Sequence, residues 1–576
     1  MIDQFANQEE LTLTDFARHS LPRRFQTVGF YVRVVAMYTI PVCLSPLLHH
    51  RSPENHCAFI VLYVLLLWLF QAYRQAVLIC ITIPSFLQPA MTGTPFLPLT
   101  LIYVILYALV VNGVETTNLH KRVILTFLLV FGGKSGFIMG GFVITTTLVS
   151  MWTNAVRTAA IVLPIAMEAI QHIQDNRLFH VLELRTRYLH RTKGIGTPIM
   201  EAHYLIEGGI VIPDVIRILS EFFTVKKGLL IAISYSAVLG SMGSVVGCGG
   251  NLFVKAYMEQ MYGYRRITIY KWVQCHLPLT VLCSFLLWCV LSVCYASDVV
   301  SSDHISKRAF EDVIYRRFAE LGPVSYTEIS TLVTLVGLGV AIVASHHYYD
   351  EMGTEPEGSI FNENTCVSLA LMVMYMTSHI HDWKHPRRAR ASKRARMHSF
   401  QHAVHSISWA FVVTMGAGVC VAKLIARCNL LQSVDWLLPH HLFTSTLALQ
   451  FLVGAVALVL AEINNSLNNI IIFSPLLGHM ADAMRVHPMY FVMPFALCSA
   501  FGFITTTATP VSEYVTDYGD LQEDEFVLPG IAMKIGCGLI VMLAYNTWCW
   551  DYLYLKERVY PLAGENSSTA VSSSIF

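Results

Sequence analysis

The chain has 576 residues, of which 55% are hydrophobic and only 13% are charged, and its net charge is +1. Soluble domains average about 25% charged residues. This composition excludes a disordered protein, a nucleic-acid binder that relies on net charge and a secreted disulfide scaffold, and it indicates a polytopic membrane protein. The 14 cysteines lie mostly in apolar runs and are interpreted as small core hydrophobes.

A bilayer core requires about 20 apolar residues per helix, and runs of this kind recur along the chain. The N-terminus is polar up to Leu21, shows no signal peptide and is expected in the cytoplasm. The predicted spans are 27–48, 57–72, 74–92, 97–114, 121–133, 228–260, 273–296, 329–347, 364–380, 403–424, 487–516 and 529–553.

Two further apolar stretches, 137–174 and 441–484, are interrupted by polar clusters. The clusters are 151–158 and 462–469, and each is followed by a proline, Pro164 or Pro475. Polar backbone at membrane depth is tolerated only where protein or a water-filled cavity surrounds it. Each stretch therefore predicts a re-entrant helical hairpin with a polar tip.

Two of the spans are broken as well, by a glycine-rich segment at 240–251 and by a Thr/Pro segment at 505–512. Hairpin tip, broken helix, hairpin tip and broken helix follow one another along the chain. This order is typical of inverted-repeat transporters, in which half-helix ends face an ion or substrate. The alternative is a set of ordinary glycine kinks and polar contacts between membrane helices.

The charges indicate the topology. The segment Lys384 to His398 holds seven Lys and Arg between two spans and is predicted to be cytoplasmic. Asn566-Ser567-Ser568 is a glycosylation sequon, which favours an extracellular C-terminus with a glycan on Asn566. We expect an integral protein of the plasma membrane.

Several short motifs carry a resemblance over nearly the whole chain, from about 24 to 558. The chain resembles the divalent anion/sodium symporters of the citrate and dicarboxylate group known as INDY proteins. The motifs are Asn118-Leu119-His120-Lys121-Arg122, Ser150-Met151-Trp152 with Leu163-Pro164-Ile165, Gly247-x-Gly249-x-Asn251, Leu321-Gly322-Pro323, His487-Pro488-Met489-Tyr490, Ala508-Thr509-Pro510 and Asn546-Thr547-Trp548.

The resemblance implies an all-α polytopic membrane protein that works as a homodimeric elevator transporter built from inverted repeats. A scaffold domain holds the dimer contact, and a transport domain carries two re-entrant hairpins and two broken helices. It further implies that substrate carboxylates meet a Ser-Asn-Thr triplet at each hairpin tip. Sodium ions are expected between each tip and the neighbouring broken-helix loop.

The same resemblance divides the chain into successive regions. They are a cytoplasmic N-terminus (1–26), scaffold helices (27–134), an inward hairpin (135–176), a cytoplasmic connector (177–225), a broken helix with the following helix (226–297), an amphipathic connector (298–328), scaffold helices (329–430), an outward hairpin (431–484), a broken helix with the last helix (485–558) and an extracellular tail (559–576).

The sequence departs from the family at the site itself. Counted back from the prolines, the two triplets fall on Asn154-Ala155-Val156 and Asn465-Ser466-Leu467. The candidate substrate-binding residues are Asn154, Arg157, Asn465, Ser466, Thr509 and Ser512. The candidate cation-site or loop residues are Gly247, Gly249, Asn251, Asn154, Asn465 and Ala508.

Arg157 stands where the family has a small residue. A guanidinium offers five donors in a fork that suits a carboxylate. Our hypothesis is that Arg157 replaces the charge of a bound sodium ion, which would make transport independent of sodium. The alternative is an internal ion pair with Glu168, Glu462 or Glu513, or a salt bridge to a loop.

The residues thus favour a secondary active or exchange transporter of di- and tricarboxylates such as citrate and succinate. The alternatives are a carrier of sulfate or another anion, and a transporter-derived receptor or scaffold that no longer transports. No enzyme activity, cofactor or nucleic-acid partner is expected, and the sequence leaves sodium binding open because three of four coordinating motifs are altered. The expected partners are carboxylate anions, the lipid bilayer and a second copy of the chain.

Overall fold

The computed structural model describes residues 35, 39–49, 53–69, 99–132, 138–193, 212–263, 267–295, 304–352, 363–384, 407, 409–427, 430–433, 445–519, 521–553 and 555–556. This part of the chain is helical and contains no strand. Its first half comprises α4 (Pro46–His49), α5 (Pro53–Leu69), α7 (Leu99–Thr116), α8 (Leu119–Gly132), α9 (Ile138–Ser150), α10 (Ala155–Lys193), α12 (Ile212–Ser241), α13 (Gly249–Tyr262) and α14 (Ile269–Tyr295). Its second half comprises α16 (His304–Leu321), α17 (Tyr326–Met352), α18 (Glu363–Lys384), α22 (Trp409–Arg427), α23 (Leu430–Ser433), α24 (Thr446–Ile463), α25 (Ser466–Ala483), α26 (Met489–Cys498), α27 (Pro510–Gly519), α28 (Asp524–Asn546) and α29 (Trp548–Tyr552).

Several helices have the length and composition of membrane spans. Within the described residues, six meet both criteria: Ala155–Asn176, Phe222–Ser241, Ile269–Tyr295, Tyr326–Tyr348, Thr446–Ile463 and Asp524–Asn546. The outer faces are apolar, as exposed Val333, Val336 and Val340 on α17 show. An apolar surface of this kind suits lipid, and the helical ladder satisfies the backbone groups that lipid cannot. The prediction of an all-α polytopic membrane protein is thus confirmed, while the predicted span at 74–92 lies outside the described residues.

The two polar interruptions form the ends of helix pairs. Helices α9 and α10 pack together and are joined by residues 151–154, which we call the first tip. Helices α24 and α25 pack together in the same way and are joined by Asn464 and Asn465, the second tip. Prolines Pro164 and Pro475 lie inside the second helix of each pair. Whether the pairs are re-entrant and related as inverted repeats stays a prediction.

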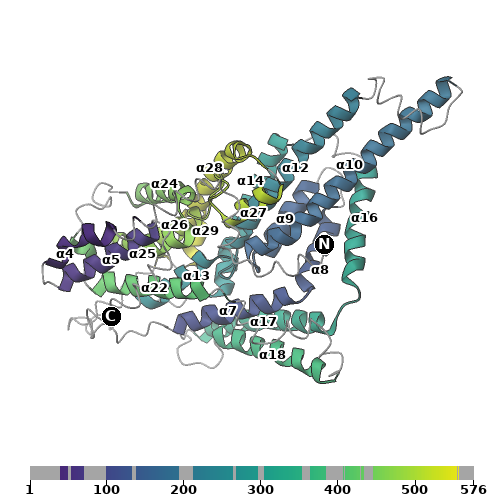
Figure 1. The fold of residues 1–576 in the computed structure, drawn as a ribbon. Helices are drawn as coiled ribbons and strands as arrows, with labels where there is room; N and C mark the ends of the chain where they lie inside the picture. Colours follow the sequence, from purple (N-terminus) through teal and green to yellow (C-terminus); the bar gives the residue numbers. More distant parts are fainter. Residues whose placement is uncertain are drawn as a thin grey trace.

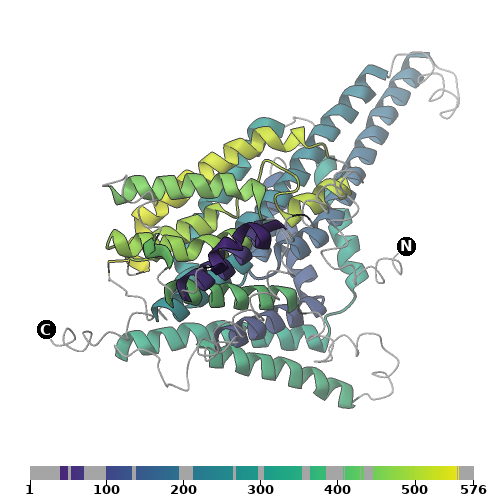
Figure 2. The ribbon, with the colours of Figure 1, turned by 60° about the vertical axis from the view of Figure 1, so that its left-hand side comes forward.

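Each of the two broken spans forms two helices separated by an irregular segment. The first span separates into α12 and α13 around residues 242–248, which we call the first loop. The second separates into α26 and α27 around residues 499–509, the second loop. The helix α10 extends beyond the end of the hairpin predicted at 135–176, because it continues to Lys193. It projects from the body beside the beginning of α12, and together these form the two arms seen in Figures 1 and 2.

Helices α7, α17 and α18 lie together on one side of the molecule, at the bottom of Figures 1 and 2. Arg122 of α8 ties α8 to α17 and to the turn that precedes α17. Its guanidinium bonds to the Glu328 carboxylate (3.1 Å) and donates to the carbonyl oxygens of Leu321 (3.3 Å), Gly322 (2.7 Å) and Pro323 (3.1 Å). Gly322 has a φ of 68°, a conformation that glycine adopts readily. Two motifs that are almost 200 residues apart therefore meet at one guanidinium.

A second polar network joins two other motifs. The Asn546 amide donates to Gln450 Oε1 (2.6 Å) and accepts from the Tyr490 hydroxyl (2.8 Å), while Gln450 Nε2 donates to the Tyr490 carbonyl oxygen (3.1 Å). Buried amides of this kind hold helices together only when their hydrogen bonds are complete. The network therefore fixes α24, α26 and α28 against one another.

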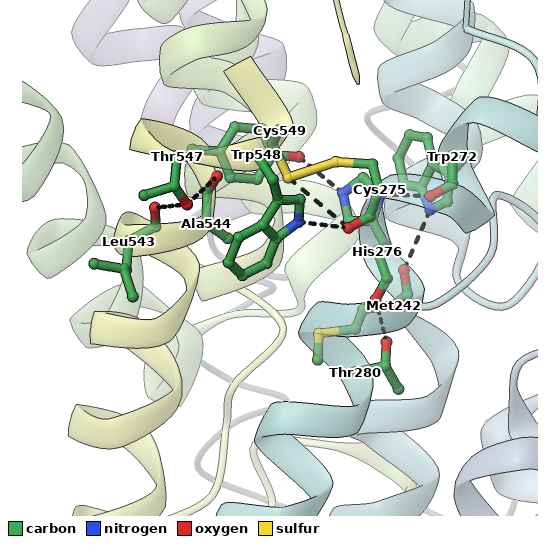
Figure 3. The surroundings of a disulfide bond; sticks show 11 residues. Met242, Trp272, Cys275, His276, Thr280, Leu543, Ala544, Thr547, Trp548 and Cys549 are labelled. Atoms are coloured by element: carbon green, nitrogen blue, oxygen red, sulfur yellow. Dashed lines mark hydrogen bonds between the residues drawn. A yellow bond between two sulfur atoms is a disulfide. The ribbon is translucent and has the colours of Figure 1, made fainter. Parts of the chain in front are cut away.

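The cysteines have more than one role. Cys283 and Cys537 are buried thiols, as the sequence predicted, but Cys294 is exposed, so the core interpretation is wrong for that residue. Cys275 of α14 and Cys549 of α29 form a disulfide with a Cα–Cα distance of 5.6 Å, within the ordinary range. Figure 3 shows that Trp548 joins the same two helices, because its indole N–H donates to the Cys275 carbonyl oxygen (3.0 Å). The sequence did not predict this bond.

The Cys275–Cys549 disulfide can be tested chemically. Peptides containing Cys275 and Cys549 should remain linked in mass spectra of unreduced protein. The double substitution Cys275→Ser/Cys549→Ser should lower stability by about 2–5 kcal/mol in thermal unfolding, because the bond closes a long loop of the chain. Cys294→Ser, an exposed thiol, is the control and should change nothing. Two unlinked peptides in unreduced protein would contradict the assignment.

Candidate functional site

The first tip is built around an asparagine cap. Asn154 precedes α10, and its side-chain oxygen accepts a hydrogen bond from the Val156 backbone N–H (2.9 Å). Such a cap satisfies one of the donors that every helix start leaves open. The cap uses only the amide oxygen, so the exposed amide nitrogen of Asn154 is not consumed by it. Behind it, the hydroxyls of Thr153 and Thr158 lie 2.6 Å apart.

The second tip repeats this geometry. Asn465 precedes α25, and its side-chain oxygen accepts from the Leu467 backbone N–H (3.0 Å). A proline follows ten residues after each capping asparagine. The two tips therefore share one register, in which Asn154 corresponds to Asn465 and Arg157 to Asn468. Each tip also presents a helix N-terminus, where the peptide dipoles favour an anion.

The first loop is held against the first tip. The Ser244 hydroxyl donates to the carbonyl oxygen of Met151 and accepts from the Gly247 N–H (3.1 Å). Asn251 closes the loop, because its amide donates to the carbonyl oxygens of Ser241 (3.2 Å) and Ser244 (2.9 Å). Gly247 lacks a Cβ where one would collide with the Ser241 carbonyl. Gly247 and Asn251 thus shape the loop.

The second loop is held against the second tip by Glu462. Its carboxylate accepts from the N–H groups of Ile504 (3.2 Å) and Thr505 (2.9 Å) and from the Thr505 hydroxyl (2.7 Å). The Lys534 ammonium on α28 completes the arrangement at 2.5 Å. Glu462 lies three residues before Asn465, as Met151 does before Asn154. Both tips therefore use the same position to hold the neighbouring loop.

Thr509 and Ser512 come together at the start of α27. The Thr509 hydroxyl accepts from the Ser512 N–H (3.1 Å) and lies 2.8 Å from the Ser512 hydroxyl. Ser512 is buried and also pairs with Ser234 of α12 (3.0 Å). These contacts order α27 and link it to α12. Ala508, just before them, is half-buried.

The tips and loops of the two halves also meet each other. The start of α13 packs on α25, where a Cβ on Gly250 would lie 2.5 Å from Ile470. Ser466, next to the second tip, lies beside Cys248 of the first loop. The neighbouring Gly249 packs on Phe411 of α22. On the other side α10 packs on α27. The elements that carry the candidate residues of the two halves thus pack against one another.

Arg157 has a partner that is none of the three acids named from the sequence. It forms an ion pair with Glu115 near the end of α7. Two of the predicted partners pair with other residues: Glu168 pairs with Arg316 and Arg317 of α16, and Glu462 pairs with Lys534. Half of the Arg157 side chain is exposed, against 10% for Glu115. Glu115 comes just after the predicted span 97–114, so in the sequence it resembled an ordinary interfacial acid.

Asn464 is a second residue that the sequence did not single out. Its side-chain oxygen accepts from the Asn465 N–H (2.9 Å), but its buried amide nitrogen has no hydrogen-bond partner among the described residues. A buried donor without a partner is costly. An acceptor on a bound substrate or water would satisfy it. The predicted glycan acceptor Asn566 and most of the basic loop 384–398 lie outside the described residues.

Comparisons with known proteins show the family of the chain. Residues 26–555 match the family described as the sodium:sulfate symporter transmembrane region, and the chain belongs to that family. Na(+)/dicarboxylate cotransporter 3 of Rattus norvegicus is 22% identical over 550 residues, covering 90% of this chain and 92% of the relative. The sodium-dependent high-affinity dicarboxylate transporter 2 of Caenorhabditis elegans is 22% identical, covering 92% and 97%. The Na(+)/citrate cotransporter of Rattus norvegicus is 21% identical, covering 89% and 94%. The family and these relatives are transporters, not enzymes.

The role of Glu462 can be tested by a double-mutant cycle. Glu462→Ala removes the acceptor of the second loop and leaves the largely buried Lys534 ammonium unpaired, so we expect a loss of about 3–5 kcal/mol in thermal unfolding. The double variant Glu462→Ala/Lys534→Met should lose less stability than Glu462→Ala alone, because it leaves no unpaired buried charge. Glu320→Ala, an exposed acid on α16, is the control and should have little effect. Additive losses would show that the two charges are not coupled.

Proposed function

We propose that this chain is a secondary active or exchange transporter of di- and tricarboxylates resembling citrate and succinate. The observation that carries this proposal is Arg157 at the first tip, half exposed and already paired with a carboxylate. A guanidinium that pairs with one carboxylate side chain can also bind a substrate carboxylate, through the fork of donors that every guanidinium carries. The dicarboxylate and citrate relatives support the same class of substrate.

The remaining donors come from both tips. The amide nitrogens of Asn154 and Asn464 and the helix N-termini of α10 and α25 offer hydrogen bonds and positive dipole ends. Ser466 adds a hydroxyl at the start of α25. Thr509 and Ser512 then order the wall of the site, because their hydroxyls are bonded to each other.

Transport is proposed to be an elevator movement that needs no sodium. A fixed positive charge at the first tip supplies what a bound cation would supply to an anion, and it stays on the protein throughout the cycle. An exchange of one carboxylate for another fits such a carrier best. In this proposal Gly247, Gly249 and Asn251 fix the conformation of the first loop. Ala508 lies at the end of the second loop.

The topology proposed from the charges has one structural support. Disulfides persist in oxidising compartments and are rare in the cytosol. The Cys275–Cys549 bond therefore supports a non-cytoplasmic position for α29 and for the tail that follows it. This agrees with a cytoplasmic N-terminus, an extracellular C-terminus and residence in the plasma membrane. A homodimer in the bilayer is proposed from the family resemblance.

Sulfate is a second candidate substrate. The family description names sulfate, and sulfate is also a divalent oxyanion that a guanidinium can bind. A compact sulfate ion needs fewer donors than citrate does. Sulfate uptake without carboxylate uptake would therefore select this candidate. A failure to move any of these anions would favour a receptor or scaffold instead.

Uptake of radiolabelled citrate, succinate and sulfate into proteoliposomes tests the substrate. Arg157→Ala should reduce carboxylate uptake by about 10- to 100-fold, because a hydrogen-bonded charge contributes about 1.5–3 kcal/mol. Arg157→Lys keeps the charge but not the fork of donors, so its uptake should lie between that of the unmodified protein and that of Arg157→Ala. Arg308→Ala, an exposed arginine on α16, is the matched control. Unchanged uptake by Arg157→Ala would remove the role assigned to this residue.

The same assay with and without sodium tests the ion. We expect equal carboxylate uptake in sodium and choline buffers, because Arg157 supplies the positive charge. Uptake that occurs only with sodium would contradict this part of the proposal and leave the substrate assignment standing.

A further inference from the structure

Arg157 and Glu115 each occupy a helix end whose dipole disfavours their charge. Glu115 is an acid in the last turn of α7, where the partial charge of the helix is negative. Arg157 is a base in the first turn of α10, where the partial charge is positive. Neither residue stabilises its own helix. The ion pair offsets the unfavourable interaction of each charge with its helix dipole. The two charges therefore stabilise the contact between the helices and not the helices that carry them.

The pair also connects regions that the resemblance assigns to different domains. Glu115 lies in the predicted scaffold and Arg157 in the predicted moving hairpin. The guanidinium is half exposed, so a ligand can reach it without unfolding the site. Another buried pair, Lys255–Glu363, offers no such access. Glu363 there also accepts from Tyr107 (2.8 Å) and from the Ile269 N–H (3.2 Å), which encloses its carboxylate.

We propose that Glu115 is an internal competitor of the substrate, which occupies Arg157 in the empty carrier and ties the first hairpin to α7. This rests on the proposed function, in which Arg157 binds a substrate carboxylate. The substrate carboxylate replaces the Glu115 carboxylate on the same guanidinium, and the hairpin is then released from α7. Movement of the hairpin leaves Glu115 at the newly opened surface, where water solvates it.

This competition limits the empty movement of a carrier that needs no sodium. An exchanger must not cross the membrane empty, since empty movement would dissipate the gradient. A ligand shifts a conformational equilibrium only by its different affinity for the two states. In this conformation the empty hairpin is held by Glu115 and the loaded hairpin is not, so substrate is required for movement out of it.

The first test uses Glu115→Gln, which keeps the shape and removes the charge. Purified Glu115→Gln should bind citrate more tightly, by about 5- to 150-fold in calorimetry, the range typical of coupled sites. In proteoliposomes loaded with labelled citrate, net efflux into citrate-free buffer should rise relative to exchange. Glu320→Gln is the matched control and should match the unmodified protein in both measurements. Unchanged affinity and an unchanged ratio of efflux to exchange would overturn the inference.

Two further variants separate the ways in which the proposal can fail. Glu115→Asp keeps the charge on a shorter stem and should fall between the unmodified protein and Glu115→Gln, which covers the case in which Glu115→Gln does not fold. Arg157→Ala should bind citrate weakly. If Arg157→Ala binds citrate normally, the role proposed for Arg157 fails, and the competitor role of Glu115 fails with it. If Arg157→Ala loses binding while both Glu115 variants behave normally, only the competitor role of Glu115 fails.

Discussion

The arrangement depends on one constraint, that a backbone which leaves the helix inside a membrane protein must find its hydrogen bonds within that protein. Each tip supplies partners for the loop beside it. The Met151 carbonyl holds Ser244 of the first loop, and the Glu462 carboxylate holds Ile504 and Thr505 of the second. Asparagine caps close the tips themselves. Four irregular segments are thereby held without further secondary structure.

Two ion pairs lie beside the tips, and they differ in their access to solvent. The Glu462–Lys534 pair is enclosed and bonded on several sides, so it fixes the second loop. Arg157 differs because half of its side chain reaches solvent while its partner, Glu115, is almost buried. An enclosed pair is suited to holding a structure, and an accessible pair is suited to exchanging a partner. This difference in access separates the charges that shape the site from the charge that we propose receives the anion.

Much of the architecture was predictable from particular residues. Asn154, Asn465 and the prolines that follow them marked the tips, and the glycines near 247 marked the first loop, because a polar or glycine-rich break in an apolar run indicates backbone that leaves the helix. The disulfide was not predictable, since Cys275 and Cys549 each lie in a span and nothing in their spacing sets them apart from core thiols. The meeting of Arg122 with Leu321, Gly322 and Pro323 was equally hidden, although both motifs were visible separately.

The sequence by itself determined the class of protein, the polar breaks and the unusual arginine, because these depend on hydropathy and on local backbone chemistry. Only the tertiary structure decided which acid meets Arg157. The sequence named Glu168 and Glu462 as possible partners of Arg157. In the structure Glu168 pairs with arginines of α16, and Glu462 pairs with Lys534 of α28. Glu115 pairs with Arg157 because the end of α7 lies beside the start of α10. Ion pairs between distant segments follow from how helices pack, and helix packing is not encoded in the spacing of residues along the chain.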